Sequence, residues 1–298
     1  MNRRTFLLAG AAAPFAPALR AFAEPQLPIG DMHFHLFFVG PKPAHTQPLA
    51  RNMARGGATL AAWSLVGDMP WLKIAPGGFK QKGAPKGSEP VSWLDDEMRR
   101  IHAHIDEQGL KIVRTSADVE AALAGTPHVV LSVEGATFTN VGADKVAHAH
   151  ALGIRQIQLV HYISNPLADF QTERPAHGGM TEQGRAVIAG CEKAGVLVDL
   201  AHCSDQAARD ALAVAKKPLI FSHGSVAPAG RTPNHTMSVF KARQLRLETA
   251  RMIADRGGVA GLWALGADVG TSIESYTDRL LQMADWLGED HVAFGSDM

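Results

Sequence analysis

The chain has 298 residues with 29 basic and 29 acidic side chains, and 46% of its residues are hydrophobic. A net charge of zero gives no long-range field that would attract polyanions, which argues against a nucleic-acid-binding protein, and the hydrophobic fraction excludes disorder or a coiled coil over the whole chain. Two cysteines, Cys191 and Cys203, are too few for a disulfide scaffold. The 14 histidines raise the question of which of them lie at metal-ligand spacing.

Residues 1–23 have the pattern of an export signal. Two arginines at positions 3 and 4 precede an alanine-rich apolar run, which ends in Ala21-Phe22-Ala23. A charged start, an apolar run and a small-x-small ending are typical of a cleaved signal peptide, and paired arginines are typical of the twin-arginine route. We expect cleavage after Ala23, a periplasmic location and no membrane anchor, because the run is shorter than the roughly 20 residues of a spanning helix.

The rest of the chain alternates short apolar runs, rich in β-branched residues, with amphipathic stretches at helical spacing. This alternation is typical of parallel strands joined by crossover helices. The predicted strands are residues 28–33, 59–65, 129–134, 155–161, 197–202, 219–223, 258–262 and 292–296. The predicted helices are residues 93–108, 144–152, 181–193, 204–214, 247–256 and 275–287.

Eight strands with helices between them predict an α/β protein, a (β/α)8 TIM barrel that forms one domain over residues 24–298. A doubly wound open sheet is the alternative, but the sequence contains no GxGxxG after the first strand and no GxxxxGK[ST]. Residues 67–90 are rich in glycine, proline and lysine, and we interpret them as a long solvated loop, with a substrate lid as the alternative. Because the sequence ends at Met298, we expect the last helix of the barrel to be missing from it.

Residue types that bind metals occur at the carboxyl ends of the predicted strands, where TIM barrels have their active sites. On the first strand, His33 and His35 are two residues apart and point the same way, so they can share a metal ion. The other strand-end residues are Glu134, His161, Asp199, His202, His223 and Asp297. Two further His-x-His pairs, at positions 102 and 104 and at 148 and 150, fall in predicted helices, where a two-residue step turns the side chain by about 200°. Only the strand-end set therefore predicts a metal site.

This set resembles the site of the membrane dipeptidase (renal dipeptidase) family of the amidohydrolase superfamily. The stretches that carry the resemblance are residues 179–184, 198–204, 217–223, 256–261 and 295–297. It implies two divalent metal ions, with zinc favoured, and a metal-ligand set of His33, His35, Glu134, His202 and His223 in which Glu134 bridges both ions. His35 stands where the family has an aspartate.

The resemblance also implies the reaction and the roles of the remaining residues. The substrate is a dipeptide or a related small N-acyl amino acid, whose amide bond is hydrolysed, and a homodimer is expected. His161 would polarise the scissile carbonyl or stabilise its oxyanion, and Asp297 would transfer the proton. A substrate carboxylate needs a cation, for which Arg243 falls at the position of the family's arginine and Arg231 is an alternative in the same loop.

Two other functions remain open from the sequence. A metal-dependent deoxyribonuclease of the TatD type also uses a first-strand His-x-His, a glutamate, two histidines and a late aspartate, and it accounts for His35 directly. The zero net charge and the match around residues 198–204 weigh against it. A non-catalytic metal-binding barrel is the second alternative, because the sequence ends one residue after Asp297.

Overall fold

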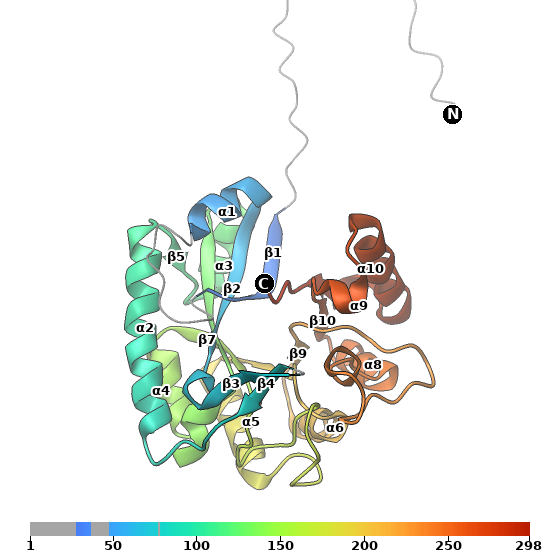
Figure 1. Cartoon of the computed structure of the whole chain (residues 1–298). Helices are drawn as coiled ribbons and strands as arrows, with labels where there is room; N and C mark the ends of the chain where they lie inside the picture. Colours follow the sequence, from blue (N-terminus) through green and yellow to red (C-terminus); the bar gives the residue numbers. More distant parts are fainter. Residues whose placement is uncertain (1–27, 37–47, 77) are drawn as a thin grey trace, which may run out of the picture.

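The structure is a computed structural model, which describes residues 28–36, 48–76 and 78–298. The export motif at residues 1–23 lies outside these residues. Eight parallel strands form a nearly closed barrel in the order β1-β2-β6-β7-β8-β9-β10-β11 (Figure 1). Their bounds are β1 Ile29–Phe34, β2 Ala58–Val66, β6 His128–Glu134, β7 Ile154–Gln158, β8 Leu197–Asp199, β9 Ile220–Phe221, β10 Val259–Leu262 and β11 Val292–Phe294. The predicted α/β fold with eight barrel strands is confirmed.

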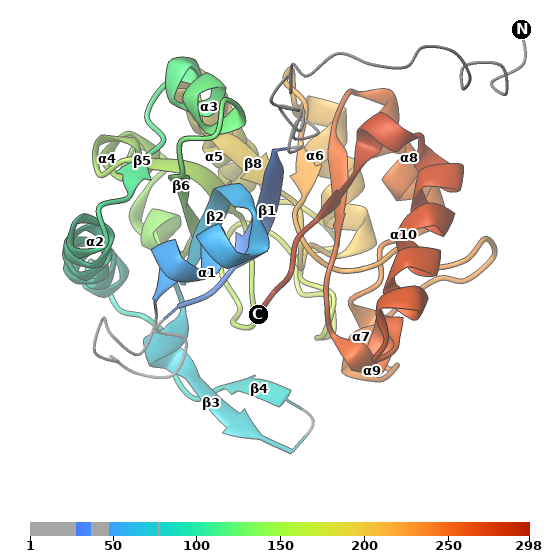
Figure 2. The same cartoon turned by 90° about the horizontal axis from the view of Figure 1, so that it is seen from above.

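Hydrogen bonds join β1 to the segment that follows β11 and so bring the two ends of the sheet together. The backbone N–H of His35 donates to the carbonyl of Met298 at 2.9 Å, and that of Asp297 donates to the carbonyl of His33 at 2.9 Å. The Asp31 carboxylate also accepts from the backbone N–H of Ser296 at 3.0 Å. The carboxyl end of the chain therefore lies beside β1 (Figure 2).

Helices surround the barrel and cover the outer face of its strands (Figure 2). They are α1 Leu49–Gly56, α2 Glu89–Glu107, α3 Ser116–Leu123, α4 Lys145–Ala151, α5 Glu182–Ala194, α6 Asp205–Val214, α7 Val239–Ala242, α8 Leu247–Asp255, α9 Gly266–Val269 and α10 Ile273–Leu287. The predicted starts of α5 and α6 are confirmed by their caps, since the hydroxyls of Thr181 and Ser204 accept from the backbone N–H groups of Gly184 and Ala207. No helix in the described part of the chain is long and apolar enough to cross a membrane.

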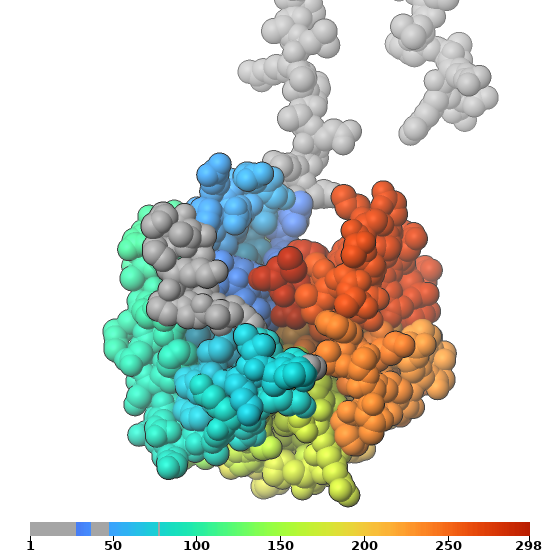
Figure 3. Space-filling view, viewed as in Figure 1, coloured from blue at the N-terminus to red at the C-terminus, as the bar shows by residue number. Residues whose placement is uncertain are grey.

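The prediction that residues 67–90 form a long solvated loop is corrected by the structure. This segment contains a 3-10 turn, Met69–Trp71, and an antiparallel hairpin of β3, Leu72–Ala75, and β4, Gly78–Gln81. The sequence did not indicate this hairpin, because lysines and glycines interrupt the alternation of apolar and polar residues that predicts strands. Lys73 and Lys80, for example, pair with each other across it. The hairpin lies over the carboxyl end of the barrel (Figure 3). The Lys80 ammonium on β4 forms an ion pair with Glu173 at 2.7 Å.

Several short elements outside the alternation of barrel strands and helices were not predicted from the sequence. They are the helices α1, α3, α7 and α9, the strand β5, Lys111–Ile112, which pairs with the start of β6, and the 3-10 turns Thr137–Val141 and Glu289–His291. Each is too short to show a clear period. None of them changes the order of the barrel strands.

The strands β9, β10 and β11 approach closely because glycines face a backbone carbonyl. A Cβ on Gly261 or on Gly295 would lie 1.9 Å from the carbonyl oxygen of Ser222, a distance that no side chain tolerates. Glycine is therefore required at both positions. This close packing brings the residues that follow β9 and β11 toward the centre of the barrel.

Candidate metal centre

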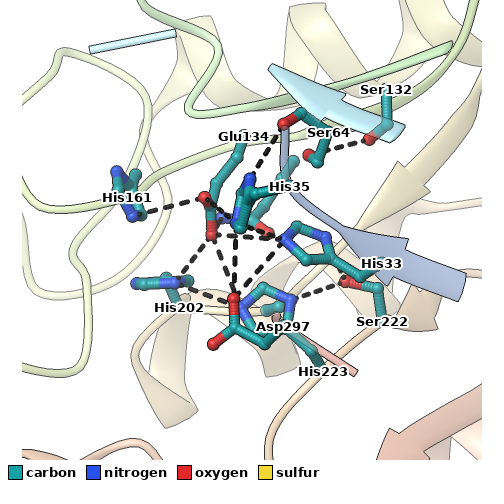
Figure 4. Close-up of polar contacts among 12 residues, drawn as sticks. His33, His35, Ser64, Ser132, Glu134, His161, His202, Ser222, His223 and Asp297 are labelled. Atoms are coloured by element: carbon teal, nitrogen blue, oxygen red, sulfur yellow. Dashed lines mark hydrogen bonds and ion pairs between the residues drawn. The ribbon is translucent and has the colours of Figure 1, made fainter. Parts of the chain in front are cut away.

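The structure brings seven of the sequence-predicted residues together at the carboxyl end of the barrel (Figure 4). They come from six strands or the turns directly after them, and they are His33, His35, Glu134, His161, His202, His223 and Asp297. His161 was predicted on a strand but follows the end of β7 by three residues. Asp199, also at a strand end, belongs to none of the candidate metal groups among the described residues, and its carboxylate accepts from backbone N–H groups.

The carboxylate of Glu134 is the centre of this cluster. Its Oε1 lies 3.0 Å from Nε2 of His202, 3.4 Å from Nε2 of His223 and 3.8 Å from Nε2 of His33. Its Oε2 lies 3.3 Å from Nε2 of His35 and 3.4 Å from Nε2 of His161. One buried carboxylate thus faces five imidazole nitrogens.

The donor set fits divalent metal ions. Three groups have ligand atoms within 4.8 Å of one another, namely His33 with His35 and Glu134, Glu134 with His202 and His223, and His33 with His223 and Asp297. Two of these groups share Glu134. In the described part of the chain, Glu134 Oε2 is buried without a hydrogen-bond partner, as expected for an atom that meets a cation. Imidazole and carboxylate together are ligands typical of zinc.

The protonation states also favour metal binding. Burial lowers the pKa of His33 to about 4, so its imidazole is neutral at pH 7. Burial and the charge of Arg243 hold the pKa values of His202 and His223 well below the usual range. The charge of His161 and a hydrogen bond from His202 keep the pKa of Glu134 low in spite of its burial. Neutral imidazoles around an ionised carboxylate are the forms that bind metals.

His35 differs from the other histidines. Burial lowers its pKa, but the neighbouring carboxylates of Asp297 and Glu134 outweigh burial and raise the pKa to about 10. Its Nδ1 donates to the backbone carbonyl of Ser64 at 2.9 Å, which leaves Nε2 directed at Oδ1 of Asp297 and Oε2 of Glu134, both at 3.3 Å. His35 therefore presents Nε2 to the cluster, as a ligand would.

Two residues of the cluster have a left-handed backbone conformation. The φ angles are +67° at His202 and +56° at Asp297. Such angles are unusual for residues other than glycine and are concentrated at functional sites. Here they turn both side chains back toward the barrel axis after the strands have ended.

Asp68 is a buried residue of the site that was not predicted from the sequence. Its Oδ1 accepts from Nδ1 of His161 at 2.7 Å, and its Oδ2 accepts from the backbone N–H of Tyr162 at 3.1 Å. Asp68 follows the end of β2 by two residues, so its position after a barrel strand could have identified it as a candidate site residue. A Cβ on Gly135, whose φ is +86°, would lie 3.1 Å from the side chain of His161, so glycine makes room for this pair.

Tyr162, also missed, connects the cluster to Arg243. Its ring packs edge-on against His202, with ring centroids 4.9 Å apart, and its hydroxyl accepts from Nη1 of Arg243 at 3.1 Å. Nη2 of Arg243 donates to Nε2 of His223 at 2.8 Å. Its Nε–H is buried with no hydrogen-bond partner among the described residues. The structure thus places one candidate cation within the site.

Arg231, the other candidate cation, is exposed and lines a separate surface cavity with Asp268 and Arg279. The structure does not bring it to the cluster. The two helical His-x-His pairs lie in α2 and α4, as predicted. In the first pair, His102 contacts the carbonyl of Leu152, whereas His104 contacts Gln108.

The structure thus combines a parallel barrel with a shared glutamate and converging histidines at its carboxyl end. The chain matches the model of the membrane dipeptidase family, peptidase family M19, over residues 54–298, and it belongs to this family. The match excludes the nuclease family as the family of this chain.

Curated relatives match part of the chain. It is 28% identical over 204 residues to the dipeptidase verJ of Clonostachys rogersoniana, a match that covers 66% of this chain and 50% of that one. It is 33% identical over 153 residues to the dipeptidase tcpJ of Claviceps purpurea, covering 50% of this chain and 34% of that one. The chain thus spans half or less of the length of these relatives.

Solved structures share the fold. A metallo peptidase from Rhodobacter sphaeroides, liganded with a phosphinate mimic of the dipeptide L-Ala-D-Ala, superposes with a TM-score of 0.74 at 20% identity, covering 92% of this chain and 86% of that one. An amidohydrolase from Pseudomonas aeruginosa superposes with a TM-score of 0.71 at 19% identity, covering 91% and 74%. At this identity the likeness shows the barrel fold.

The raised pKa of His35 makes metal binding depend on pH. In the metal-free protein the pKa is about 10, so at pH 7 His35 carries a proton that a metal ion must displace. We expect the apparent affinity for the first divalent ion to rise about tenfold per pH unit from pH 7 to 9, measured by competition with a chromophoric chelator. The proton also stabilises the metal-free fold fully below the unfolded pKa of 6.5, and this contribution is lost as pH rises through 10.

The matched variants are His35→Asn and His102→Asn. The first removes an imidazole ligand, so it should bind the ion more weakly. It also removes the proton that the ion must displace, so the affinity should depend less on pH. The second lies on α2, outside the cluster, and should keep the wild-type dependence. A His35→Asn protein with the wild-type slope would contradict the role of His35.

Proposed function

We propose that the protein is a metal-dependent dipeptidase, which hydrolyses the amide bond of dipeptides or related small N-acyl amino acids with two divalent ions, zinc being favoured. The observation that carries the proposal is the position of Glu134 in two ligand groups at once. Membership of the membrane dipeptidase family and the dipeptide mimic bound to the metallo peptidase from Rhodobacter sphaeroides support the substrate class. The paired arginines of the export motif support a periplasmic location.

In the proposed mechanism, His33, His35 and Glu134 would hold one ion, and Glu134, His202 and His223 the other. When bound, such ions polarise a carbonyl and lower the pKa of water so that hydroxide forms near neutral pH. Asp297 would accept the proton of the attacking water on Oδ1, which lies 3.3 Å from Nε2 of His35, and return it to the leaving amine.

His161 would stabilise the charge that develops on the carbonyl oxygen. Burial lowers its pKa, but the charges of Asp68 and Glu134 outweigh burial and raise the pKa overall. Because Asp68 accepts from Nδ1, the other nitrogen faces the cluster and can donate its N–H to an oxyanion. A fixed donor in a buried site needs little reorganisation during the reaction.

Arg243 would bind the free carboxylate of the substrate. Its buried Nε–H has no partner among the described residues, so an anion would satisfy it. Nη2 of Arg243 now donates to Nε2 of His223, and it would become a second free N–H donor if His223 were used to hold an ion. Two guanidinium donors of this kind suit a carboxylate.

The central test of this function is metal-dependent release of amino acids. Protein loaded with zinc should contain about two ions per chain and hydrolyse dipeptides such as L-Ala-L-Ala or L-Ala-D-Ala, and chelation should abolish the activity. Asp297→Ala should lower kcat by about 10²- to 10⁴-fold, because proton transfer is lost. The panel includes N-acetyl-alanine and a single-stranded oligonucleotide as alternative substrates.

Several outcomes would reject parts of this proposal. Full activity in the metal-free protein would reject a metal mechanism. Cleavage of the oligonucleotide without release of amino acids would favour the nuclease alternative, and metal binding without any hydrolysis would favour a non-catalytic barrel. An unchanged rate in Asp297→Ala would show that this residue does not transfer the proton.

Carboxylate recognition distinguishes Arg243 from Arg231. Arg243→Lys should raise KM for a dipeptide about 10- to 100-fold, because charge-assisted hydrogen bonds to the substrate are lost. It should change KM little for the matching dipeptide amide, which has no carboxylate. Arg231→Ala is the control and should behave as wild type with both substrates. The reverse pattern, with selective loss in Arg231→Ala, would assign recognition to the exposed arginine.

A further inference from the structure

A single buried hydroxyl lies behind two of the metal-facing histidines. Ser222 directly follows β9, and its side chain is fully buried. Its Oγ lies 2.9 Å from Nδ1 of His223 and 3.3 Å from Nδ1 of His33 (Figure 4). These histidines come from opposite ends of the sequence and contribute to different ligand groups with Glu134.

The buried carboxylate of Asp199 sets the direction of the Ser222 proton. It accepts from the backbone N–H groups of Ala201 at 3.0 Å and of Ser222 at 2.9 Å, and from Nε2 of Gln156 at 3.3 Å. Burial raises the pKa of this carboxylate to about 6, and hydrogen bonding with the Ser222 side chain opposes that rise. A hydroxyl has one proton and two lone pairs. With its proton directed to Asp199, the Ser222 oxygen keeps both lone pairs for the two imidazoles.

The partners of the opposite ring nitrogens agree with this assignment. Nε2 of His223 accepts from the Arg243 guanidinium, which can only donate, so the proton of a neutral His223 is on Nδ1. Nδ1 of His33 faces the same Ser222 hydroxyl oxygen at 3.3 Å. Because the proton of that hydroxyl is directed to Asp199, its oxygen can only accept here, so the proton of a neutral His33 is also on Nδ1.

We propose that Ser222 is a positioning residue that fixes His33 and His223 together in the tautomer whose Nε2 lone pair is free for a metal ion. Asp199 orients the hydroxyl, and the hydroxyl accepts from both Nδ1–H groups. One side chain thereby prepares both ligand groups that meet at Glu134. The inference rests on the proposed two-metal centre.

The test compares Ser222→Ala with Ser132→Ala. Ser132 is a buried serine on β6 whose hydroxyl accepts from that of Ser64 and contacts no metal-facing histidine in the described structure, so it is a matched control. We expect Ser222→Ala to weaken binding of both zinc ions about 10- to 100-fold in a chelator competition, as is typical for loss of an outer partner of a metal ligand. Ser132→Ala should stay within about twofold of wild type, and Ser222→Thr, which retains a hydroxyl, should recover most of the affinity.

A second readout reports the tautomers directly. Nitrogen-15 NMR of metal-free wild-type protein at pH 7.5 should show Nδ1–H tautomers for His33 and His223, and Ser222→Ala should show mixed tautomers at both. This measurement on wild type decides the matter even if Ser222→Ala does not fold, because an Nε2–H tautomer at either histidine would overturn the proposal.

The affinity results separate this proposal from the proposed function. Unchanged affinities in Ser222→Ala, or weakening of one ion alone, would overturn the shared role of Ser222. If wild type binds two ions with the expected dependence on Ser222 but releases no amino acids from dipeptides, the dipeptidase function fails and the role of Ser222 stands.

Discussion

The site depends on compensating one buried negative charge. An ionised carboxylate in a protein interior is costly unless cations or hydrogen-bond donors surround it. Glu134 is buried at the end of β6, and imidazole nitrogens from β1 and from the turns after β7, β8 and β9 lie within 3.8 Å of its oxygens. These side chains meet only if the barrel closes, so closure of the fold and assembly of the site are the same event. Divalent ions would neutralise the carboxylate at the point where those nitrogens converge.

The sequence predicted the cluster because its position follows from topology. Carboxyl ends of parallel strands meet at one rim whatever the loops do, so strand-end residues such as His33, Glu134 and His223 were found from their place after apolar runs. Loop conformation is not readable in this way. Asp68 and the β3–β4 hairpin were missed, and Arg243 could not be separated from Arg231, because each depends on how an irregular segment folds back over the barrel.

His35 shows how the structure resolves a departure from the family pattern. At the position of the family aspartate, its imidazole still directs Nε2 at Glu134 and Asp297, held by the carbonyl of Ser64. The geometry of a ligand is therefore preserved, but a neutral imidazole replaces a negative charge. The Asp297 carboxylate, close to both His33 and His35, can offset part of that loss.

The most direct test of the account is to locate metal ions in crystals of the zinc-loaded protein by anomalous diffraction at the zinc edge. Two anomalous peaks are predicted, each about 2.0–2.2 Å from an oxygen of Glu134, one beside His33 and His35 and the other beside His202 and His223. A single peak, or zinc that contacts these histidines without Glu134, would contradict the claim that this carboxylate organises a two-metal centre.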